Sequence, residues 1–389
     1  MPEKIMVVDD EPDLESLIRQ RFRKKIRENE YDFVFANNGL QALTKLLEHP
    51  DIGLILTDIN MPEMDGLTLL ARLNELKNPA LRTVIVSAYG DMDNIRTAMN
   101  RGAFDFVTKP VDFTDLETTI NKTIQELELL RNFQKEHDQL IAIQHDLSIA
   151  RSIQQAILPK KFPPFPERKE FEIYASMNAA KEVGGDFFDF FLVDKDRLGF
   201  VMADVSGKGI PAAIFMAVSR TLLKATALKG LNAGDSLAHV NNLLCPESIA
   251  SMFVTIFYGV LNTATGEIEY ANGGHNPPYL IREDGKVEEL EMTGGIALGI
   301  IEGLPFSVKK ITLKPNEGIF LFTDGVTEAF NVNEDLYSEE RLISKLTDNA
   351  KLNSKELAEA VIADVHVYSS GVPQSDDITV LSLKYLGNG

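Results

Sequence analysis

The stretch from Asp112 to Leu158 contains neither glycine nor proline, the two residues that most often interrupt a helix. Its apolar residues recur at intervals of three and four, as on one face of an α-helix. They are Leu116, Ile120, Ile124, Leu127, Leu130, Phe133, Leu140, Ile143, Leu147, Ala150, Ile153 and Ile157. Such a helix would extend about 60 Å, too far to lie on one small domain. We therefore expect an N-terminal domain at 1–120, a helical linker at 121–165 and a C-terminal domain at 166–389.

An apolar stripe on a helix of this length is commonly covered by a second helix, so we expect a coiled-coil homodimer through the linker. The polar stretch from Gln134 to Gln139 weakens the stripe, and the alternative is a helix packed only against its own domains. Four prolines then end the helix: Pro159, Pro163, Pro164 and Pro166.

Charge and composition exclude several classes of protein. The formal net charge of −19 argues against a nucleic-acid-binding surface, since such a surface needs clustered Lys and Arg. No apolar run reaches the roughly 20 residues that cross a bilayer, and the N-terminus lacks the pattern of a signal peptide. The single cysteine, Cys245, has no intramolecular disulfide partner and is interpreted as a small buried apolar residue. These features predict a cytoplasmic protein that binds neither nucleic acid nor membrane.

Short β-rich runs alternate with amphipathic helical stretches over the first 120 residues. The runs are Ile5–Val8, Phe33–Ala36, Leu54–Thr57, Val84–Ser87 and Phe106–Thr108. This alternation predicts a doubly wound α/β domain with a parallel sheet of five strands. Ligands of such sheets bind beyond the carboxyl ends of the strands.

Polar residues stand at the carboxyl ends of four of these strands. They are Asp9 and Asp10, then Asp58, Ser87 and Lys109. Clustered carboxylates repel one another, and hard oxygen ligands suit Mg²⁺, so we expect a bound Mg²⁺. With the metal and Lys109 offsetting negative charge, Asp58 can attack a phosphoryl group and form an aspartyl phosphate.

The motifs VVDDEPD, LILTDINMPEMDG, VIVSAYG and FDFVTKP resemble those of response-regulator receivers. The resemblance implies a flavodoxin-like fold, a cognate histidine kinase, a cis Lys109–Pro110 bond and Asp58 as the phosphoacceptor. It implies an Mg²⁺ held by Asp10, Asp58 and the Asn60 carbonyl, with Asp9 assisting. It also implies that Ser87 and Phe106 are switch residues and that Lys109 contacts the phosphate.

The C-terminal segment mixes strand-like and helical stretches, which predicts an α+β or layered sandwich domain. The strand-like runs include Leu198–Ala203, Met252–Leu261, Ile268–Ala271 and Ile319–Thr323, and the helical stretches are 210–228, 234–244 and 354–369. Acids beside glycines follow several runs: Asp186, Asp189, Asp204, Asp324, Asp376 and Asp377. Carboxylates without a histidine or cysteine cluster favour Mg²⁺ or Mn²⁺ over Zn²⁺. Two such ions about 4 Å apart can hydrolyse a phosphomonoester with a bridging hydroxide.

The motifs GGDFFDF, MADVSGKG, FLFTDGVTEA and SDDITVL, with GGHNPPYL and ARSIQQAILP, resemble the SpoIIE/RsbU class of metal-dependent (type 2C, PPM) protein phosphatases over residues 145–385. The resemblance implies an αββα sandwich and two Mn²⁺ or Mg²⁺ ions. Its ligands would be Asp204, which bridges the ions, the Val205 carbonyl, Asp324 and Asp376, with Asp186 at or next to a metal. The family's order favours Asp376 as the ligand and leaves Asp377 for a supporting hydrogen bond or a turn cap, but the choice stays open.

The resemblance also implies a substrate, phosphoserine or phosphothreonine on a STAS anti-anti-sigma protein. We expect phosphorylation of Asp58 to act on the phosphatase through the linker helix. Asp189 is interpreted as structural. Lys208 and His275 are interpreted as a solvated charge and a turn-ordering residue rather than as a phosphate contact or a general acid.

Three other functions would account for part of the sequence. One is a catalytically silent adaptor that binds a sigma-factor regulator, and the complete set of acids argues against it. Another is a phosphatase whose receiver only mediates dimerisation, which the complete receiver set argues against. The third is a nucleotide cyclase, suggested by GGD alone but lacking the other cyclase signals.

Overall fold

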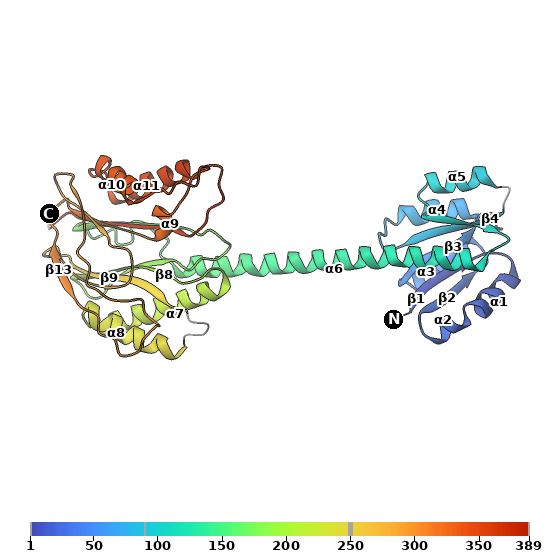
Figure 1. Ribbon diagram of the computed structural model, residues 1–389, viewed down its shortest axis with the longest axis horizontal. Coiled ribbons are helices and arrows are strands. Elements are labelled where there is room, and N and C mark those ends of the chain that lie inside the picture. Colours follow the sequence, from blue (N-terminus) through green and yellow to red (C-terminus); the bar gives the residue numbers. More distant parts are fainter. Residues whose placement is uncertain (1, 89–90, 248–251, 388–389) are drawn as a thin grey trace. The chain divides into compact units, whose positions relative to one another are not determined.

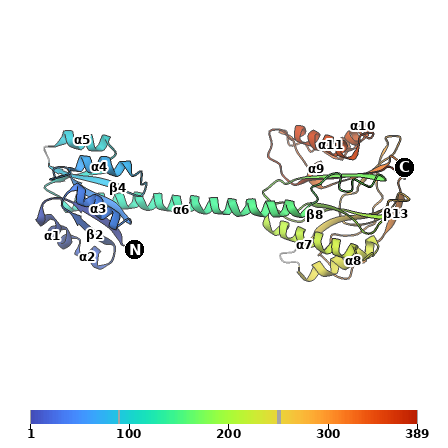
Figure 2. The same cartoon turned by 180° about the vertical axis from the view of Figure 1, so that it is seen from behind.

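The computed structural model describes residues 2–88, 91–247 and 252–387, so Tyr89 and Gly90 of the VIVSAYG motif lie outside the described residues. The chain forms two compact units, Met1–Ile143 and Gln144–Gly389. Figures 1 and 2 show the ribbon from opposite sides, with the first unit in blue and cyan. Each unit has its own sheets and core.

The N-terminal unit is a five-stranded parallel sheet in the order β2-β1-β3-β4-β5. Its strands are β1 (Glu3–Val8), β2 (Tyr31–Ala36), β3 (Ile52–Asp58), β4 (Arg82–Ala88) and β5 (Asp105–Lys109). Its helices, besides the long helix described next, are α1 (Pro12–Arg21), α2 (Arg23–Arg27), α3 (Gly39–Glu48), α4 (Gly66–Glu75) and α5 (Met92–Asn100). Side chains of α1 pack on one face of the sheet, and those of α3, α4 and α5 pack on the other. The predicted doubly wound fold is confirmed.

Helix α6 (Phe113–Ile157) is the predicted long helix, 45 residues in one piece. Its first turns bury Leu116, Ile120 and Ile124 against the sheet of the N-terminal unit. Gln154 near its end is buried in the C-terminal unit. Between these ends Leu140 is 59% exposed and Ile143 is 56% exposed, so the middle of α6 carries apolar side chains that nothing covers within the chain as described.

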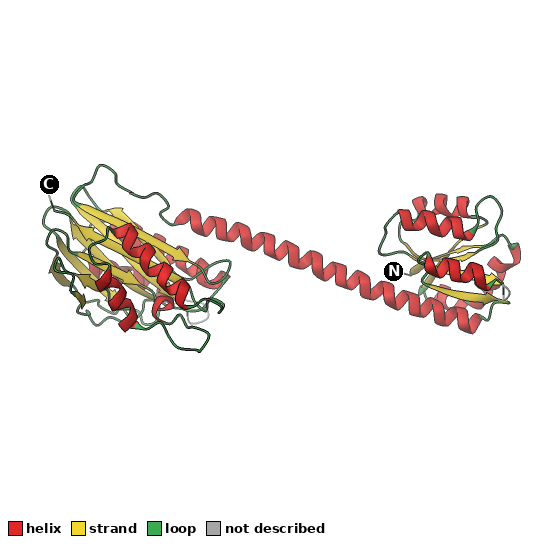
Figure 3. Ribbon diagram, turned by 90° about the horizontal axis from the view of Figure 1, so that it is seen from above, coloured by secondary structure: helices red, strands yellow, loops and turns green. Residues whose placement is uncertain are grey.

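The C-terminal unit contains two five-stranded antiparallel sheets, with strands in the orders β13-β10-β9-β8-β7 and β12-β11-β14-β15-β6. The strands are β6 (Phe171–Asn178), β7 (Phe187–Leu192), β8 (Arg197–Val205), β9 (Val254–Asn262), β10 (Glu267–Gly273), β11 (Tyr279–Ile281), β12 (Val287–Glu289), β13 (Lys309–Thr312), β14 (Gly318–Phe322) and β15 (Ile378–Tyr385). The helical segments are α7 (Ile210–Ala227), α8 (Ala233–Leu244), the 3₁₀ turn η1 (Cys245–Glu247), α9 (Asp324–Thr327), α10 (Glu339–Asp348) and α11 (Ser354–Tyr368), and Figure 3 distinguishes them from the strands by colour.

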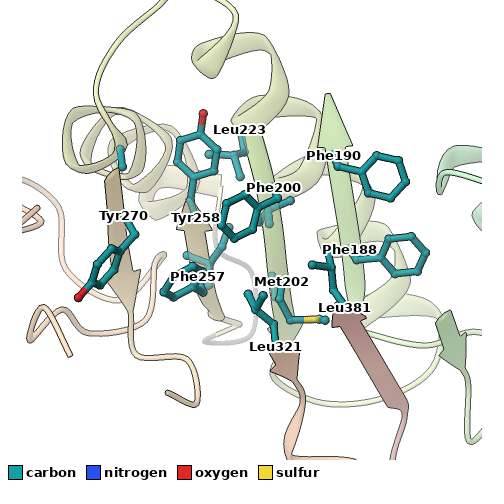
Figure 4. Packing of buried hydrophobic residues seen from close by; sticks show 14 of the residues in the cluster. Phe188, Phe190, Phe200, Met202, Leu223, Phe257, Tyr258, Tyr270, Leu321 and Leu381 are labelled. Atoms are coloured by element: carbon teal, nitrogen blue, oxygen red, sulfur yellow. The ribbon is translucent and has the colours of Figure 1, made fainter. Parts of the chain in front are cut away.

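Alternating residues of β14 divide the core of this unit into layers. Ile319 and Leu321 belong to the large cluster that joins the two sheets, which Figure 4 shows with Met202, Leu321 and Leu381 close together. Phe320 and Phe322 belong to a second cluster under α10 and α11. This period of two is that of a strand buried on both faces. With α7 and α8 on the outer face of the first sheet, the unit is the αββα sandwich that we predicted.

Helix α7 and Cys245 bear on two predictions made from composition, the absence of a membrane span and the burial of the cysteine. Helix α7 is long and apolar enough, by length and composition alone, to span a membrane. However, Phe215, Met216 and Leu223 of α7 are buried in the core of the unit, as in the central helix of a globular domain.

Cys245 is only half-buried, because it caps the carboxyl end of α8 with its Sγ 3.5 Å from Asn241 Oδ1. The expectation of a buried Cys245 is therefore wrong.

Candidate functional site

Three carboxylates meet at the carboxyl edge of the N-terminal sheet. Asp9 and Asp10 follow β1 and Asp58 ends β3, adjacent strands of the sheet. Ligand oxygens of the three residues lie within 4.8 Å of one another, and among the described residues no other trio of acidic, histidine or cysteine side chains is this close. A cluster of oxygens at this spacing fits a hard divalent cation such as Mg²⁺.

Lys109 closes this cluster from the end of β5. Its Nζ lies 2.9 Å from Asp9 Oδ2, 2.8 Å from Asp58 Oδ2 and 2.8 Å from Glu11 Oε1. Burial lowers the pKa of Lys109, but the hydrogen bonds to Asp58, Glu11 and Asp9 outweigh it and raise that pKa overall. Burial raises the pKa of Asp9, and the hydrogen bond from Lys109 opposes the rise. The site therefore carries a fixed positive charge next to Asp58.

The remaining receiver residues lie around Asp58. Ser87 is buried at the end of β4, where its hydroxyl donates to Asp91 Oδ2 at 3.3 Å. Phe106 on the neighbouring β5 is 37% exposed. The backbone N–H of Asn60 lies 3.4 Å from Asp58 Oδ1, and the Lys109–Pro110 bond is cis. Asp9, Asp10, Asp58, Ser87 and Lys109 thus lie at the carboxyl ends of their strands, whereas Phe106 lies three residues before Lys109 on β5.

A second acidic cluster forms in the C-terminal unit from four separate segments. We use the name acidic cluster for Asp186, Asp204, Asp324 and Asp376. Asp204 lies in β8, Asp324 begins α9 after β14, and Asp186 and Asp376 lie in the loops before β7 and β15. Each of these four acids lies close enough to at least one other for their charges to interact, and this repulsion contributes to the raised pKa values of Asp186, Asp204 and Asp324.

Burial and mutual repulsion oppose ionisation of the acidic cluster. Burial raises the pKa of Asp204 to about 7, with the charge of Asp324 adding to the effect. Burial, then the charges of Asp204 and Asp377, raise the pKa of Asp186 well above its ordinary value. Burial, then the charge of Asp376, raise that of Asp324. Divalent cations would remove this penalty, so the donor set fits Mg²⁺ or Mn²⁺.

Glycines allow the segments of the acidic cluster to approach closely. A Cβ on Gly185 would lie 2.8 Å from the Val205 carbonyl oxygen, and one on Gly325 would lie 2.0 Å from the Asp377 carbonyl oxygen. Either contact is shorter than real Cβ atoms tolerate. The glycines beside Asp186 and Asp324 are therefore needed for the backbone to pack at this site.

The side chains of Asp376 and Asp377 point to different partners. Asp377 is 6% exposed, its Oδ1 accepts from Ala180 N at 2.8 Å, and its Oδ2 accepts from Gly185 N at 2.8 Å. Asp376 is half-buried, with its Oδ2 2.8 Å from Lys208 Nζ and its charge felt at Asp324. Both oxygens of Asp377 are thus engaged with backbone N–H groups, while Asp376 accepts from Asp377 N at 2.9 Å through its Oδ1 and pairs with Lys208 through its Oδ2. The charges of both residues reach Asp204.

Lys208 and His275 occupy contrasting environments. Lys208 is exposed at the mouth of the acidic cluster, where it also donates to the Ser375 carbonyl at 2.6 Å. His275 is buried, its Nδ1 lies 3.0 Å from Thr255 Oγ1, and burial lowers its pKa to about 4. The Asn272 carboxamide forms two hydrogen bonds with the backbone of His275, so Asn272 orders the turn after β10 in which His275 lies.

Sequence reasoning missed several side chains that hold the predicted ones. The hydroxyls of Thr323 and Thr379 donate to Asp186 Oδ2 at 2.7 and 2.6 Å, and Glu11 pairs with Lys109. All three lie in motifs that contain predicted acids: Glu11 directly follows Asp10, Thr323 directly precedes Asp324, and Thr379 lies two residues after Asp377. Gln154 in ARSIQQAILP binds the backbone of Gly184, and nothing in the local sequence indicates that partner.

The fold and these two sites define a response-regulator receiver joined to a phosphatase domain of the PP2C type. Two family models match: Response regulator receiver domain over residues 5–121, and Stage II sporulation protein E (SpoIIE) over residues 194–386. Phosphoserine phosphatase RsbU of Bacillus subtilis is 30% identical over 261 residues, which cover 67% of this chain and 74% of RsbU. The chain therefore belongs to the family of SpoIIE/RsbU-type PP2C phosphatases, with an N-terminal receiver.

Two further comparisons, one with a related sequence and one with a solved structure, are consistent with this assignment. Protein IcfG of Synechocystis sp. is 29% identical over 265 residues, and the match spans 61% of this chain but only 41% of IcfG. The solved SiaA-PP2C domain of Pseudomonas aeruginosa superposes with a TM-score of 0.56 at 23% identity, covering 63% of this chain and 98% of that chain. This second likeness concerns the fold alone and supports the predicted sandwich.

Proposed function

We propose that this protein is a metal-dependent phosphoserine and phosphothreonine protein phosphatase controlled by phosphorylation of its receiver. The observation that carries the proposal is the convergence of Asp186, Asp204, Asp324 and Asp376 from four segments of the sandwich. Loss of any of these acids would be expected in a silent adaptor, and none is lost. The phosphatase is thus favoured over the adaptor.

The roles proposed for these residues are those that the resemblance to SpoIIE/RsbU-type phosphatases implies. Asp204, between the other acids, is assigned to both metal ions, and the Val205 carbonyl to one of them. Asp324 and Asp376 are assigned to the second ion, and Asp377 to holding backbone N–H groups rather than metal. Bound Mg²⁺ or Mn²⁺ would supply a hydroxide nucleophile and offset the charge of the phosphoryl oxygens.

Asp186 is assigned a place at or next to a metal. The hydroxyls of Thr323 and Thr379 fix one of its oxygens, which leaves the other to face Asp204. Lys208 at the mouth of the cluster restrains Asp376 through their 2.8 Å ion pair. The buried His275 is assigned to its turn and not to a role as general acid, because burial lowers its pKa to about 4 and so favours the neutral imidazole.

The substrate is proposed to be a phosphorylated STAS anti-anti-sigma protein. The support is family membership, together with a relative, RsbU, that is named a phosphoserine phosphatase. A partner-switching role of this kind fits a cytoplasmic location.

The receiver is proposed to accept a phosphoryl group on Asp58 from a cognate histidine kinase. Asp9, Asp10, Asp58 and the Asn60 carbonyl are assigned to Mg²⁺, and Lys109 to the phosphate. Ser87 and Phe106, on adjacent strands, are the residues proposed to move on phosphorylation. Lys109 already lies 2.8 Å from Asp58, which supports a direct contact with the new phosphate oxygens.

The change is proposed to reach the phosphatase through α6, in a homodimer paired along that helix. Leu140, Ile143, Leu147 and Ala150 follow one another at intervals of three and four, the spacing of a coiled-coil seam. The first two are more than half exposed. A second copy of α6 would cover them.

The test is release of phosphate, at varied Mn²⁺, from an aryl phosphate and from a phosphorylated STAS protein. Wild type is compared with Asp204→Asn and, with and without beryllofluoride, with Asp58→Ala. We expect metal-dependent turnover that Asp204→Asn lowers at least a hundredfold and that beryllofluoride changes only when Asp58 is present. Absence of turnover with both substrates in every receiver state would favour the adaptor, and turnover insensitive to beryllofluoride would remove the proposed control.

A further inference from the structure

The side chain of Gln154, on the last turns of α6, forms two hydrogen bonds with the backbone of one residue. Its Nε2 donates to the Gly184 carbonyl at 2.6 Å, and its Oε1 accepts from Gly184 N at 3.1 Å. Gln154 is 6% exposed, whereas the adjacent Ile153 is 58% exposed and Gln155 is exposed. A buried carboxamide that satisfies both polar groups of a single peptide residue sets the position of that residue closely.

Gly184 belongs to the loop between β6 and β7, residues 179–186, which is held from its other side by Asp377. Asp377 accepts from the backbone N–H groups of Ala180 and Gly185, both at 2.8 Å. A Cβ on Gly184 would lie 2.1 Å from Asp377 Oδ2, so the backbone lies directly against that carboxylate. The loop is therefore fixed between α6 and the segment that precedes β15.

The fixed loop leads directly into the acidic cluster. Asp186 follows Gly184 by two residues, and its own N–H lies 3.4 Å from Asp377 Oδ2. Its side chain is 2% exposed and accepts hydrogen bonds from the Thr323 and Thr379 hydroxyls. A shift of the backbone at Gly184 would accordingly displace the Asp186 carboxylate from the position where it faces Asp204.

We propose that Gln154 is a positioning residue through which α6 sets the metal affinity of the acidic cluster, by holding Gly184 and thereby Asp186. The inference rests on the proposed function, since it assigns metal ions to that cluster. It gives Gln154, the first of the two glutamines in the ARSIQQAILP motif, a physical role. It also provides a direct contact between the helix that continues from the receiver and the loop that carries a metal-site acid.

The test compares Gln154→Met with Gln155→Met in the full chain. Methionine has about the length and volume of glutamine but can form neither of the two hydrogen bonds. Gln155→Met makes the same change at an exposed position of the same turn and is the matched control. Gln154→Asn is the second variant, which keeps the carboxamide but withdraws it from Gly184. Mn²⁺ binding is measured by calorimetry. The part of the Mn²⁺ binding that remains in Asp204→Asn is assigned to the receiver, and the part that Asp204→Asn removes is assigned to the acidic cluster.

We expect both Gln154 variants to weaken this portion of Mn²⁺ binding roughly tenfold, as loss of groups that orient metal ligands commonly does, and Gln155→Met to leave it unchanged. Unchanged Mn²⁺ binding in folded Gln154→Met, with or without a lower unfolding temperature, would overturn the proposal, because a purely structural glutamine changes stability alone. Wild-type Mn²⁺ binding without phosphatase turnover would contradict the proposed function instead. Activity as a function of Mn²⁺ should show the same tenfold shift, with a smaller change at saturating metal.

Discussion

The guanidinium of Arg220 lies 2.7 Å from Oδ2 of Asp189, a carboxylate that is only 1% exposed. Arg220 is on α7 and Asp189 is in β7, so the pair joins the helix to the outer face of the first sheet. Lys224, one turn further along α7, lies 3.5 Å from the same oxygen. Asp189 therefore faces α7 rather than the acidic cluster, which supports its interpretation as a structural residue.

Replacing Arg220 with methionine should destabilise the C-terminal unit by about 3 kcal/mol, because the more distant Lys224 then remains as the one cation paired with this buried carboxylate among the ion pairs described here. Lys224→Met should cost about 1 kcal/mol or less, since the Lys224 side chain is 37% exposed. Native-state hydrogen exchange of peptides from α7 and β7 gives the free energy of opening. Equal losses from the two variants would show that Arg220 is not the principal partner of Asp189.

His275 should make the stability of the C-terminal unit depend on pH. Burial lowers its pKa to about 4, below the ordinary value of 6.5 that applies in the unfolded chain. Between these values the unfolded chain binds a proton that the folded chain does not, so stability falls as pH drops from 6.5 toward 4. Compared with His275→Gln, the wild type should lose up to about 1.36 kcal/mol more per pH unit in this window.

Urea unfolding at a series of pH values measures this difference, followed by hydrogen exchange so that the two units are distinguished. His366→Gln, at an exposed histidine of the same unit, is the control and should keep the wild-type slope. Parallel curves for wild type and His275→Gln between pH 6.5 and 4 would mean that His275 is protonated in the folded unit.

The sequence was sufficient for those features that local patterns determine. Strand β3 is an unbroken apolar run ending in Asp58, so its burial in a parallel sheet and the placement of Asp58 at the sheet edge could both be predicted. The same holds for α6, whose apolar spacing runs without a breaker from Phe113 to Ile157. Short strands such as β11 and β12, three residues each, carry too little pattern to be predicted.

Side-chain partners far apart in the sequence could not be predicted. Gln154 and Gly184 are 30 residues apart, and Asp186 and Thr379 are 193 apart. Their contacts depend on how the loops pack, which periodicity does not encode. The partners of Asp376 and Asp377 could not be predicted either, because only the packed structure shows that Asp377 binds the Gly185 backbone and that Asp376 pairs with Lys208.

Mg²⁺ should stabilise the N-terminal unit through the cluster of Asp9, Asp10 and Asp58. At a concentration 100 times its Kd, a ligand of the folded state alone adds about 2.7 kcal/mol to the free energy of unfolding. Asp10→Asn should remove most of this gain, because it takes one carboxylate from the trio. Asp32→Asn, at an exposed position of β2, should keep it. Hydrogen exchange of peptides from β1 and β3, in EDTA and in Mg²⁺, measures the difference, and an equal response of both variants would exclude this trio as the Mg²⁺ site.

Charges placed on the proposed seam of α6 should abolish dimerisation. Leu140 and Ile143 are 59% and 56% exposed and lie on the seam, whereas Ile141 is 52% exposed and lies beside it. Burying two glutamates per chain against their copies is unfavourable through both desolvation and like-charge repulsion, so Leu140→Glu with Ile143→Glu should raise the dimer Kd at least a hundredfold. Ile141→Glu should change it less than tenfold. Sedimentation equilibrium of the full chain measures all three, and if the wild type is itself a monomer at tens of micromolar, the exposed face of α6 is not covered by a second copy.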